Sequence, residues 1–308
     1  MRVPYEWLCE LVPVPDGPEA LAERLSLCAL EVEEIERPLE GVVVGRLAET
    51  RPHPNADRLT LCTVEDGGAE PRNVVCGASN MKAGDRVALA TPGTTLPGGL
   101  TIKKSKIRGE RSEGMLCAAD ELGLGEDHSG ILILGADAAP GSPAAAALGL
   151  GSAVLEVALL PDRGDCASVF GIAREVAALY DLTATAPDCA VREAGDPIGP
   201  AVSVEIADAE RCPRYMARLV RGVTVGPSPE WLQRRLISLG ARPINNVVDV
   251  TNLILHELGQ PLHAFDAARI PGGRIGVRCA EPGERLRLLD EREIELGQDD
   301  LVIADEKR

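Results

Sequence analysis

Short apolar runs separated by turn residues dominate the chain between residues 41 and 134. Runs of this kind are typical of β-strands, and the Gly- and Pro-containing breaks between them mark turns. The pattern predicts one brief helix at 118–122 and strands at 42–44, 59–64, 73–76, 87–90, 102–107 and 130–134. Five or six short strands with one helix favour a small β-barrel such as an OB-fold.

Helical periodicity precedes this β-rich region. Asp16 and Pro18 are helix-start signals, and Leu21, Leu25 and Cys28 then fall on one helical face. The first 38 residues are therefore expected to form a short strand or turn followed by an amphipathic helix.

The second half of the chain mixes both periodicities. A low-complexity stretch at 135–153 marks a boundary. Ser228 at the cap, Pro229 at the first position and Gly240 after the last turn predict one helix. Further elements are predicted as helices at 168–180 and 245–257 and as strands at 154–160, 202–206, 215–220 and 301–304.

Charge and composition restrict the function. The 308 residues are 45% hydrophobic, enough for two or three buried cores, and carry 48 acidic against 32 basic side chains. Because phosphates require a basic face, any contact with RNA must use a local basic patch. Nine scattered cysteines without C-x-x-C spacing suit reduced thiols in the cytoplasm, and neither a metal site nor a membrane span is expected.

One basic run stands out within the acidic chain. Residues 39–150 contain eleven basic and fourteen acidic side chains, yet five of the basic ones lie within nine positions: Lys103, Lys104, Lys106, Arg108 and Arg111. Such a cluster fits a phosphate backbone, although lysines on a strand also form ordinary solvated faces. None of the seven aromatic residues lies in this region, so unpaired bases have no stacking platform there.

A polar stretch at 242–252 has the richest candidate chemistry. On a helix, Asn245, Asp249 and Asn252 would share one face, and a loop at 260–266 adds His263 and an aromatic ring. The stretch could be a structural hydrogen-bond network, because buried amides and carboxylates need partners. It could equally form the polar wall of a small-molecule pocket.

Several motifs resemble one family. The segments 53–59, 75–81, 102–108 and 112–115 look like a tRNA-binding OB module. The segments 5–8, 30–35 and 121–130 resemble the phenylalanine–tRNA ligase β subunit of bacteria, and 242–252 with 260–266 are similar to the signature of its B3/B4 domain. One departure is Asp162, where that family usually has Asn.

The resemblance implies an α+β multidomain fold. An OB-fold β-barrel at 39–150 would be inserted into a small α/β N-terminal domain formed by 1–38 and 151–200, the latter including a linker. An α/β B3/B4 editing domain at 201–308 would follow, and it is expected to be incomplete.

The resemblance also implies a function. In an (αβ)2 ligase, a heterotetramer, the α subunit attaches phenylalanine to tRNA(Phe) with ATP and Mg²⁺, neither of which this segment is expected to bind. The β subunit docks tRNA and hydrolyses tyrosine wrongly attached to it. Carried over by position, Thr251, Asn252 and His263 would line the editing pocket, with Asn246 and Asp249 in support. The 308 residues alone are expected neither to aminoacylate nor to edit efficiently.

Two other functions remain open from the residues. The chain could be a free-standing tRNA-binding OB protein with a non-catalytic tail, or a trans-acting aminoacyl-tRNA deacylase. The deacylase predicts turnover by the chain alone, whereas the other two functions predict none.

Overall fold

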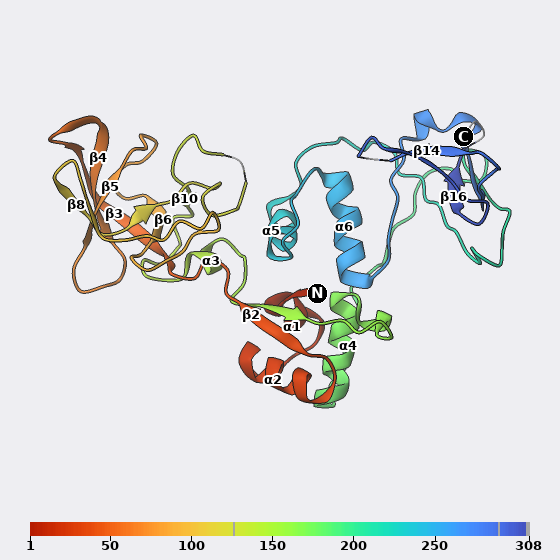
Figure 1. Cartoon of the computed structure of the whole chain (residues 1–308), viewed down its shortest axis with the longest axis horizontal. Coiled ribbons are helices and arrows are strands. Elements are labelled where there is room, and N and C mark those ends of the chain that lie inside the picture. Colours follow the sequence, from red (N-terminus) through yellow and green to blue (C-terminus); the bar gives the residue numbers. More distant parts are fainter. Residues whose placement is uncertain (126, 289, 306–308) are drawn as a thin grey trace. The chain divides into compact units, whose positions relative to one another are not determined.

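A three-stranded antiparallel sheet joins segments that lie far apart in the sequence. β11 (Val154–Val157) is its middle strand and pairs with β1 (Arg2–Pro4) on one side and β2 (Val32–Glu36) on the other. Three helices share an apolar core with this sheet, namely α1 (Tyr5–Leu11), α2 (Pro18–Cys28) and α4 (Val169–Tyr180) (Figure 1). The helix predicted from Pro18 onward is confirmed as α2, and the helix predicted at 168–180 is confirmed as α4. Ser168 caps α4 by accepting a hydrogen bond from the Gly171 N–H.

This computed structural model describes residues 1–125, 127–288 and 290–305, which fall into two units. The first unit comprises Met1–Pro187 and Gly226–Leu262, and the second comprises Asp188–Val225 and His263–Arg308. Among the described residues, no helix combines the length and the apolar character needed to cross a bilayer.

The β-rich region forms an antiparallel sheet of six strands. Its order is β10–β6–β3–β4–β5, and β9 also pairs with β6. The bounds are Val42–His53 for β3, Ala56–Glu65 for β4, Arg72–Cys76 for β5, Arg86–Ala90 for β6, Met115–Leu116 for β9 and Ile133–Leu134 for β10. β6 is buried on both faces, because Val87 and Leu89 enter one apolar cluster while Ala88 and Ala90 enter another.

In this region the helix predicted at 118–122 is wrong, and two predicted strands are confirmed only in part. Strand β7 (Ser105–Ile107) covers only the end of the predicted strand at 102–107, since Ile102 is buried in a loop whose backbone bonds to Gly93 and Thr94. Residues 119–123 form turns instead of the predicted helix, and they end at Gly123, which adopts a positive φ of 69°. Only Ile133 and Leu134 of the predicted strand at 130–134 join the sheet, and the strands do not close a barrel within the described residues.

The first unit is completed by α3 (Ala144–Ala147), the 3₁₀ turn η1 (Gly164–Cys166), α5 (Glu230–Ser238) and α6 (Asn246–Leu258). Leu232 and Leu236 of α5 are buried in the core of α1, α2 and α4. Both predicted helices are confirmed, but Ser228 is not the cap of α5. The N-cap is Pro229, which has no side-chain donor or acceptor, and the Ser228 hydroxyl is used elsewhere.

The second unit contains a small mixed sheet. β13 (Arg274–Cys279) runs parallel to β12 (Ser203–Ile206) and antiparallel to β16 (Leu301–Ala304), and a separate hairpin pairs β14 (Arg285–Arg287) with β15 (Glu293–Glu295). Two 3₁₀ turns, η2 (Ala267–Arg269) and η3 (Pro271–Gly273), precede β13. Residues 215–220, all within the described part of the chain, form no strand, so that prediction is wrong. The chain is thus a mixed α/β protein built on several sheets.

Candidate functional site

The carboxylate of Asp249 lies inside the first unit. Its side chain is fully buried and accepts hydrogen bonds from the Ser228 hydroxyl at 2.5 Å and from the Ile244 backbone N–H at 2.8 Å. These bonds tie the first turn of α6 to the segments that precede α5 and α6. Both oxygens of the Asp249 carboxylate therefore accept structural hydrogen bonds, as a buried carboxylate requires.

The two asparagines at the start of α6 also bond to the backbone. Asn245 is the N-cap, and its side chain accepts hydrogen bonds from the N–H groups of Val247 and Val248. Asn246 exchanges bonds with Gly226, donating from its N–H and accepting at its amide oxygen. The predicted shared face of Asn245, Asp249 and Asn252 is wrong, because Asn245 precedes the helix. An asparagine just before an apolar run is a helix-capping signal, so the sequence could have predicted that Asn245 caps α6.

The next turn of α6 carries the two remaining polar candidates of the first unit. The Thr251 hydroxyl donates to the Val248 carbonyl at 2.7 Å, which leaves the oxygen lone pairs free to accept. The half-buried Asn252 amide has no hydrogen-bond partner among the described residues. Thr251 and Asn252 are thus the side chains of this polar stretch that can still bind a ligand.

His263 belongs to the second unit. Its ring is exposed and stacks against Phe265, with 6.0 Å between centroids and 30° between planes. The Asp266 carboxylate caps η2 by accepting from the Ala268 N–H at 3.0 Å. The imidazole of His263 is therefore accessible, and an aromatic neighbour fixes one of its faces.

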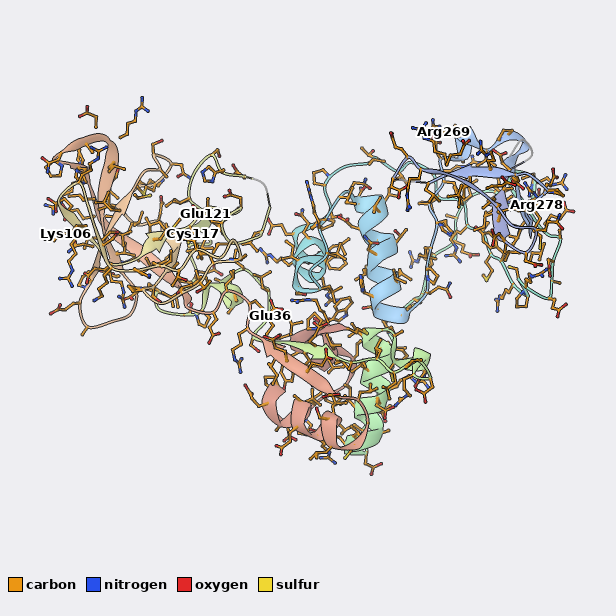
Figure 2. The ribbon with its side chains drawn as sticks, viewed as in Figure 1. Glu36, Lys106, Cys117, Glu121, Arg269 and Arg278 are labelled. Carbon is orange, nitrogen blue, oxygen red and sulfur yellow. The ribbon has the colours of Figure 1, made fainter. Side chains whose placement is uncertain are left out.

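Most of the basic run forms a hairpin of β7 with β8 (Glu110–Ser112), in which Lys106 lies opposite Arg111. Figure 2 labels Lys106 in the β-rich region. Its turn residues Arg108 and Gly109 have positive φ values of 53° and 98°, the geometry that two-residue hairpin turns favour. Lys104 and Arg111 both pair with Glu113, at 3.3 and 3.0 Å, and the hydrogen bond from Lys104 lowers the pKa of Glu113. Lys103, Lys106 and Arg108 are exposed and have no acidic partner among the described residues.

Two residues that sequence reasoning did not select hold this hairpin in place. The buried His53 ring nitrogen Nε2 lies 3.0 Å from the Ile107 carbonyl, and the Asn55 amide donates to the Arg108 carbonyl at 3.2 Å. His53 is the last residue of β3, and Asn55 lies in the turn between β3 and β4. The tip of the hairpin is therefore bonded to the end of β3 and to the turn that follows it, which holds the strands that carry the basic side chains in place.

One group of side chains has the composition of a metal site. Asp165, Cys166 and Glu175 bring their ligand atoms within 4.8 Å of one another. The Arg163 guanidinium contacts all three, at 2.6 Å from Glu175 and 2.9 Å from the Cys166 sulfur. Burial raises the pKa of the Cys166 thiol to about 11. The Arg163 guanidinium thus supplies the positive charge that faces the Asp165 and Glu175 carboxylates, in the place where a metal ion would supply it.

Comparison with protein families defines the class of protein. A model described as "Putative tRNA binding domain" matches residues 42–143, which include the hairpin, and a model described as "B3/4 domain" matches 211–308, which include the polar stretch and His263. These two segments of the chain are therefore similar to a tRNA-binding domain and to a B3/4 domain.

Curated relatives agree over the whole chain. It is 50% identical to the phenylalanine–tRNA ligase beta subunit of Anaeromyxobacter dehalogenans over 311 residues, covering 100% of this chain and 39% of that protein. It is 51% identical to the same subunit of Syntrophotalea carbinolica, covering 99% of this chain and 38% of that protein. The predicted resemblance to phenylalanine–tRNA ligase β subunits is confirmed, and the chain spans about two fifths of their length.

Proposed function

We propose that this chain acts as part of the β subunit of a cytoplasmic phenylalanine–tRNA ligase. The observation that carries the proposal is its identity of about half over its full length to curated β subunits. In this proposal the α subunit is its partner in an α2β2 heterotetramer, and the intact enzyme charges tRNA(Phe) with phenylalanine using ATP and Mg²⁺. The boundaries proposed for its domains are 1–38 with 151–200, 39–150 and 201–308.

In this proposal the β-rich domain docks tRNA through the β7–β8 hairpin. Lys103, Lys106 and Arg108 offer three cationic groups without acidic partners among the described residues. His53 and Asn55 bond to the tip of this hairpin, at the carbonyls of Ile107 and Arg108. Because the domain has no aromatic side chain, binding would rest on phosphates and shape, as in an OB-fold that tracks a backbone.

The proposed second role is hydrolysis of tyrosine wrongly attached to tRNA(Phe). A pocket shaped for phenylalanine rejects an added hydroxyl only about a hundredfold, so a ligase needs a second site that removes the error. The free acceptors and donors of Thr251 and Asn252 would hold the ester, and the accessible His263 ring would orient the ribose or a water molecule. Asn246 and Asp249 would support them through their backbone bonds.

Deacylation of tyrosyl-tRNA(Phe) tests the editing role. The heterotetramer that contains this chain is expected to release tyrosine, and His263→Ala should slow the release by roughly a hundredfold, the lower range for a positioned acid–base group. Arg285→Gln, an exposed change on β14, should leave the rate unchanged. The 308 residues alone are expected to leave the ester to its uncatalysed decay.

Two results would contradict the editing proposal. Unchanged deacylation by the His263→Ala heterotetramer would remove His263 from the site. Rapid release by the 308 residues alone, abolished by His263→Ala, would show instead a deacylase that needs no α subunit.

A further inference from the structure

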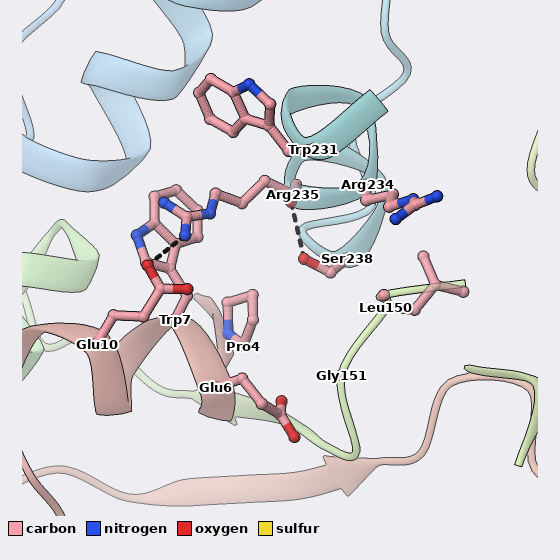
Figure 3. Close-up of a pocket in the computed structure, with 11 residues that line it drawn as sticks. Pro4, Glu6, Trp7, Glu10, Leu150, Gly151, Trp231, Arg234, Arg235 and Ser238 are labelled. Carbon is pink, nitrogen blue, oxygen red and sulfur yellow. Dashed lines mark hydrogen bonds and ion pairs between the residues drawn. The ribbon is translucent and has the colours of Figure 1, made fainter. Parts of the chain in front are cut away.

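A cavity of about 210 Å³ lies between α1 and α5 in the first unit (Figure 3). Trp231, Arg234, Arg235 and Ser238 line it from α5, at spacings that share one helical face. The opposite wall comes from α1 and the residue before it, and the loop at 149–151 forms a third wall. Both tryptophans of the chain, Trp7 and Trp231, line this cavity.

Next to the two tryptophans, one guanidinium is shared by two carboxylates. The Arg235 guanidinium lies 4.7 Å from the Trp7 ring centroid and 5.8 Å from that of Trp231, and it pairs with Glu10 and, at 3.8 Å, with Glu257. The Trp7 indole N–H also donates to Glu257 at 3.1 Å. This stack fixes α5 against α1, and because two carboxylates already share the Arg235 guanidinium, it is not available for a ligand anion.

Glu6 and Arg234 carry the two remaining charges of the cavity lining. Glu6 accepts a hydrogen bond from the Ser152 N–H at 2.7 Å but has no cationic partner among the described residues. Arg234 pairs with Glu230 at 2.8 Å, an exposed pair four residues apart on one helix. Because such pairs are weak, the guanidinium of Arg234 can exchange Glu230 for a ligand anion.

The loop at 149–151 lies directly against both charged groups. Gly149 and Gly151 adopt positive φ values of 66° and 83°. A side chain at Gly151 would collide with the Glu6 carboxylate, and one at Gly149 would come within 3.1 Å of Arg234 Cδ. Glu6 and Arg234 therefore both contact this loop, and both line the cavity.

We propose that this cavity binds a free α-amino acid with an apolar or aromatic side chain. The ligand carboxylate would bind Arg234, its ammonium group would bind Glu6, and its side chain would pack on Leu150 and the half-exposed indole of Trp231. One available charge of each sign suits a zwitterion, whereas a polyanion would meet the Glu6 carboxylate. This site lies outside the tRNA-docking and editing roles proposed above and does not depend on them.

Intrinsic fluorescence tests the proposal on the 308-residue chain, because its only two tryptophans line the cavity. L-phenylalanine should give a saturable change. 2-Phenylethylamine, which lacks the carboxylate, and 3-phenylpropionate, which lacks the ammonium group, should each bind at least about tenfold more weakly. Glu6→Gln and Arg234→Gln should each weaken binding of L-phenylalanine to a similar extent.

Matched controls separate loss of the site from loss of the fold. Glu23→Gln and Arg58→Gln, both exposed and outside the cavity, should leave the affinity unchanged. All variants should keep the circular dichroism of the parent. Calorimetry repeats each titration without relying on an optical signal.

Three results would overturn the proposal. The first is the absence of a saturable response to millimolar L-phenylalanine by fluorescence and by calorimetry. The second is equal affinity for all three compounds, which would remove the zwitterion requirement. The third is quenching of the tryptophan fluorescence by a single-stranded oligoribonucleotide but not by the amino acid, which would make the cavity a base-stacking site.

Discussion

The buried carboxylate of Asp249 determines how the polar stretch at 242–252 is used. It accepts hydrogen bonds from Ser228 and Ile244, whereas Thr251 and Asn252, one turn later, keep free hydrogen-bonding capacity. The structural interpretation therefore applies to Asn245 and Asp249, whereas the ligand-pocket interpretation stays a prediction for Thr251 and Asn252. Sequence spacing could not separate them, because the partners Ser228 and Asp249 are brought together only by the turn between α5 and α6.

Ser228→Ala tests the bond to this carboxylate. The substitution leaves a buried acceptor with one donor fewer and should lower the free energy of unfolding by about 2 kcal/mol. Urea unfolding followed by circular dichroism measures the loss. Ser105→Ala, on the exposed strand β7, should change stability by less than about 0.5 kcal/mol, and equal effects of the two substitutions would contradict the assigned role.

The cysteines should differ sharply in reactivity. Burial raises the pKa of the Cys62 and Cys117 thiols to about 12, so both stay protonated and inaccessible at neutral pH. Cys28 and Cys189 are exposed. Iodoacetamide followed by peptide mass spectrometry should label Cys28 and Cys189 in the native protein, and Cys62 and Cys117 only in denaturant. Native labelling of Cys117 at the rate of Cys28 would contradict the assigned packing.

At the scale of elements, helices were predicted more accurately than strands. α4 and α6 carry their own end signals, a capping Ser168 or Asn245 and, for α6, the left-handed Gly259 after its last turn. An apolar run needs a partner strand to become part of a sheet, and that partner is not visible locally. For this reason residues 215–220 look like a strand but form none, whereas β3 and β4 extend beyond their apolar runs as partners of each other.

An ion pair from strand β13 predicts a pH dependence. The Arg278 guanidinium donates to both carboxylate oxygens of Glu284, at 2.7 and 2.9 Å, and together with the Glu281 N–H it lowers the pKa of Glu284 from 4.5 to about 2. Because the folded pKa lies below the unfolded one, the stabilisation is complete above the unfolded pKa and disappears as the pH falls through the folded one.

The Glu284→Gln variant should therefore lose less stability than the parent chain between about pH 5 and pH 2. Thermal unfolding at a series of pH values measures the difference. Glu295→Gln, on the exposed strand β15, should follow the parent. Parallel pH profiles for the parent and Glu284→Gln would show that the pair makes no pH-dependent contribution.

At the scale of the whole molecule, the chain is strongly acidic and still offers a basic surface. Its formal charge is -16, but the β7–β8 hairpin concentrates lysines and arginines within nine positions. The sequence predicts this cluster correctly. It could not indicate which charges are free, because Glu113 neutralises Lys104 and Arg111 through the folded geometry of the hairpin and the segment that follows it.

The arrangement of the chain in the first unit was also only partly predictable. Low complexity at 135–153 marked the end of the β-rich region, but pairing of β11 between β1 and β2 joins residues more than a hundred positions apart. The Trp7–Arg235–Trp231 stack likewise unites the two ends of this unit. Pairings at such separation leave no trace in local periodicity.

Binding of tRNA(Phe) as a function of salt tests the central claim most directly. Lys103→Gln with Lys106→Gln removes two cations that lack acidic partners among the described residues, whereas Lys104→Gln removes one held by Glu113. The double variant should weaken binding and flatten the plot of log K against log salt by about 1 for each phosphate that is no longer neutralised. Lys104→Gln should have a smaller effect, and Lys82→Gln none. Unchanged affinity and slope for the double variant at low salt would contradict tRNA docking by this hairpin.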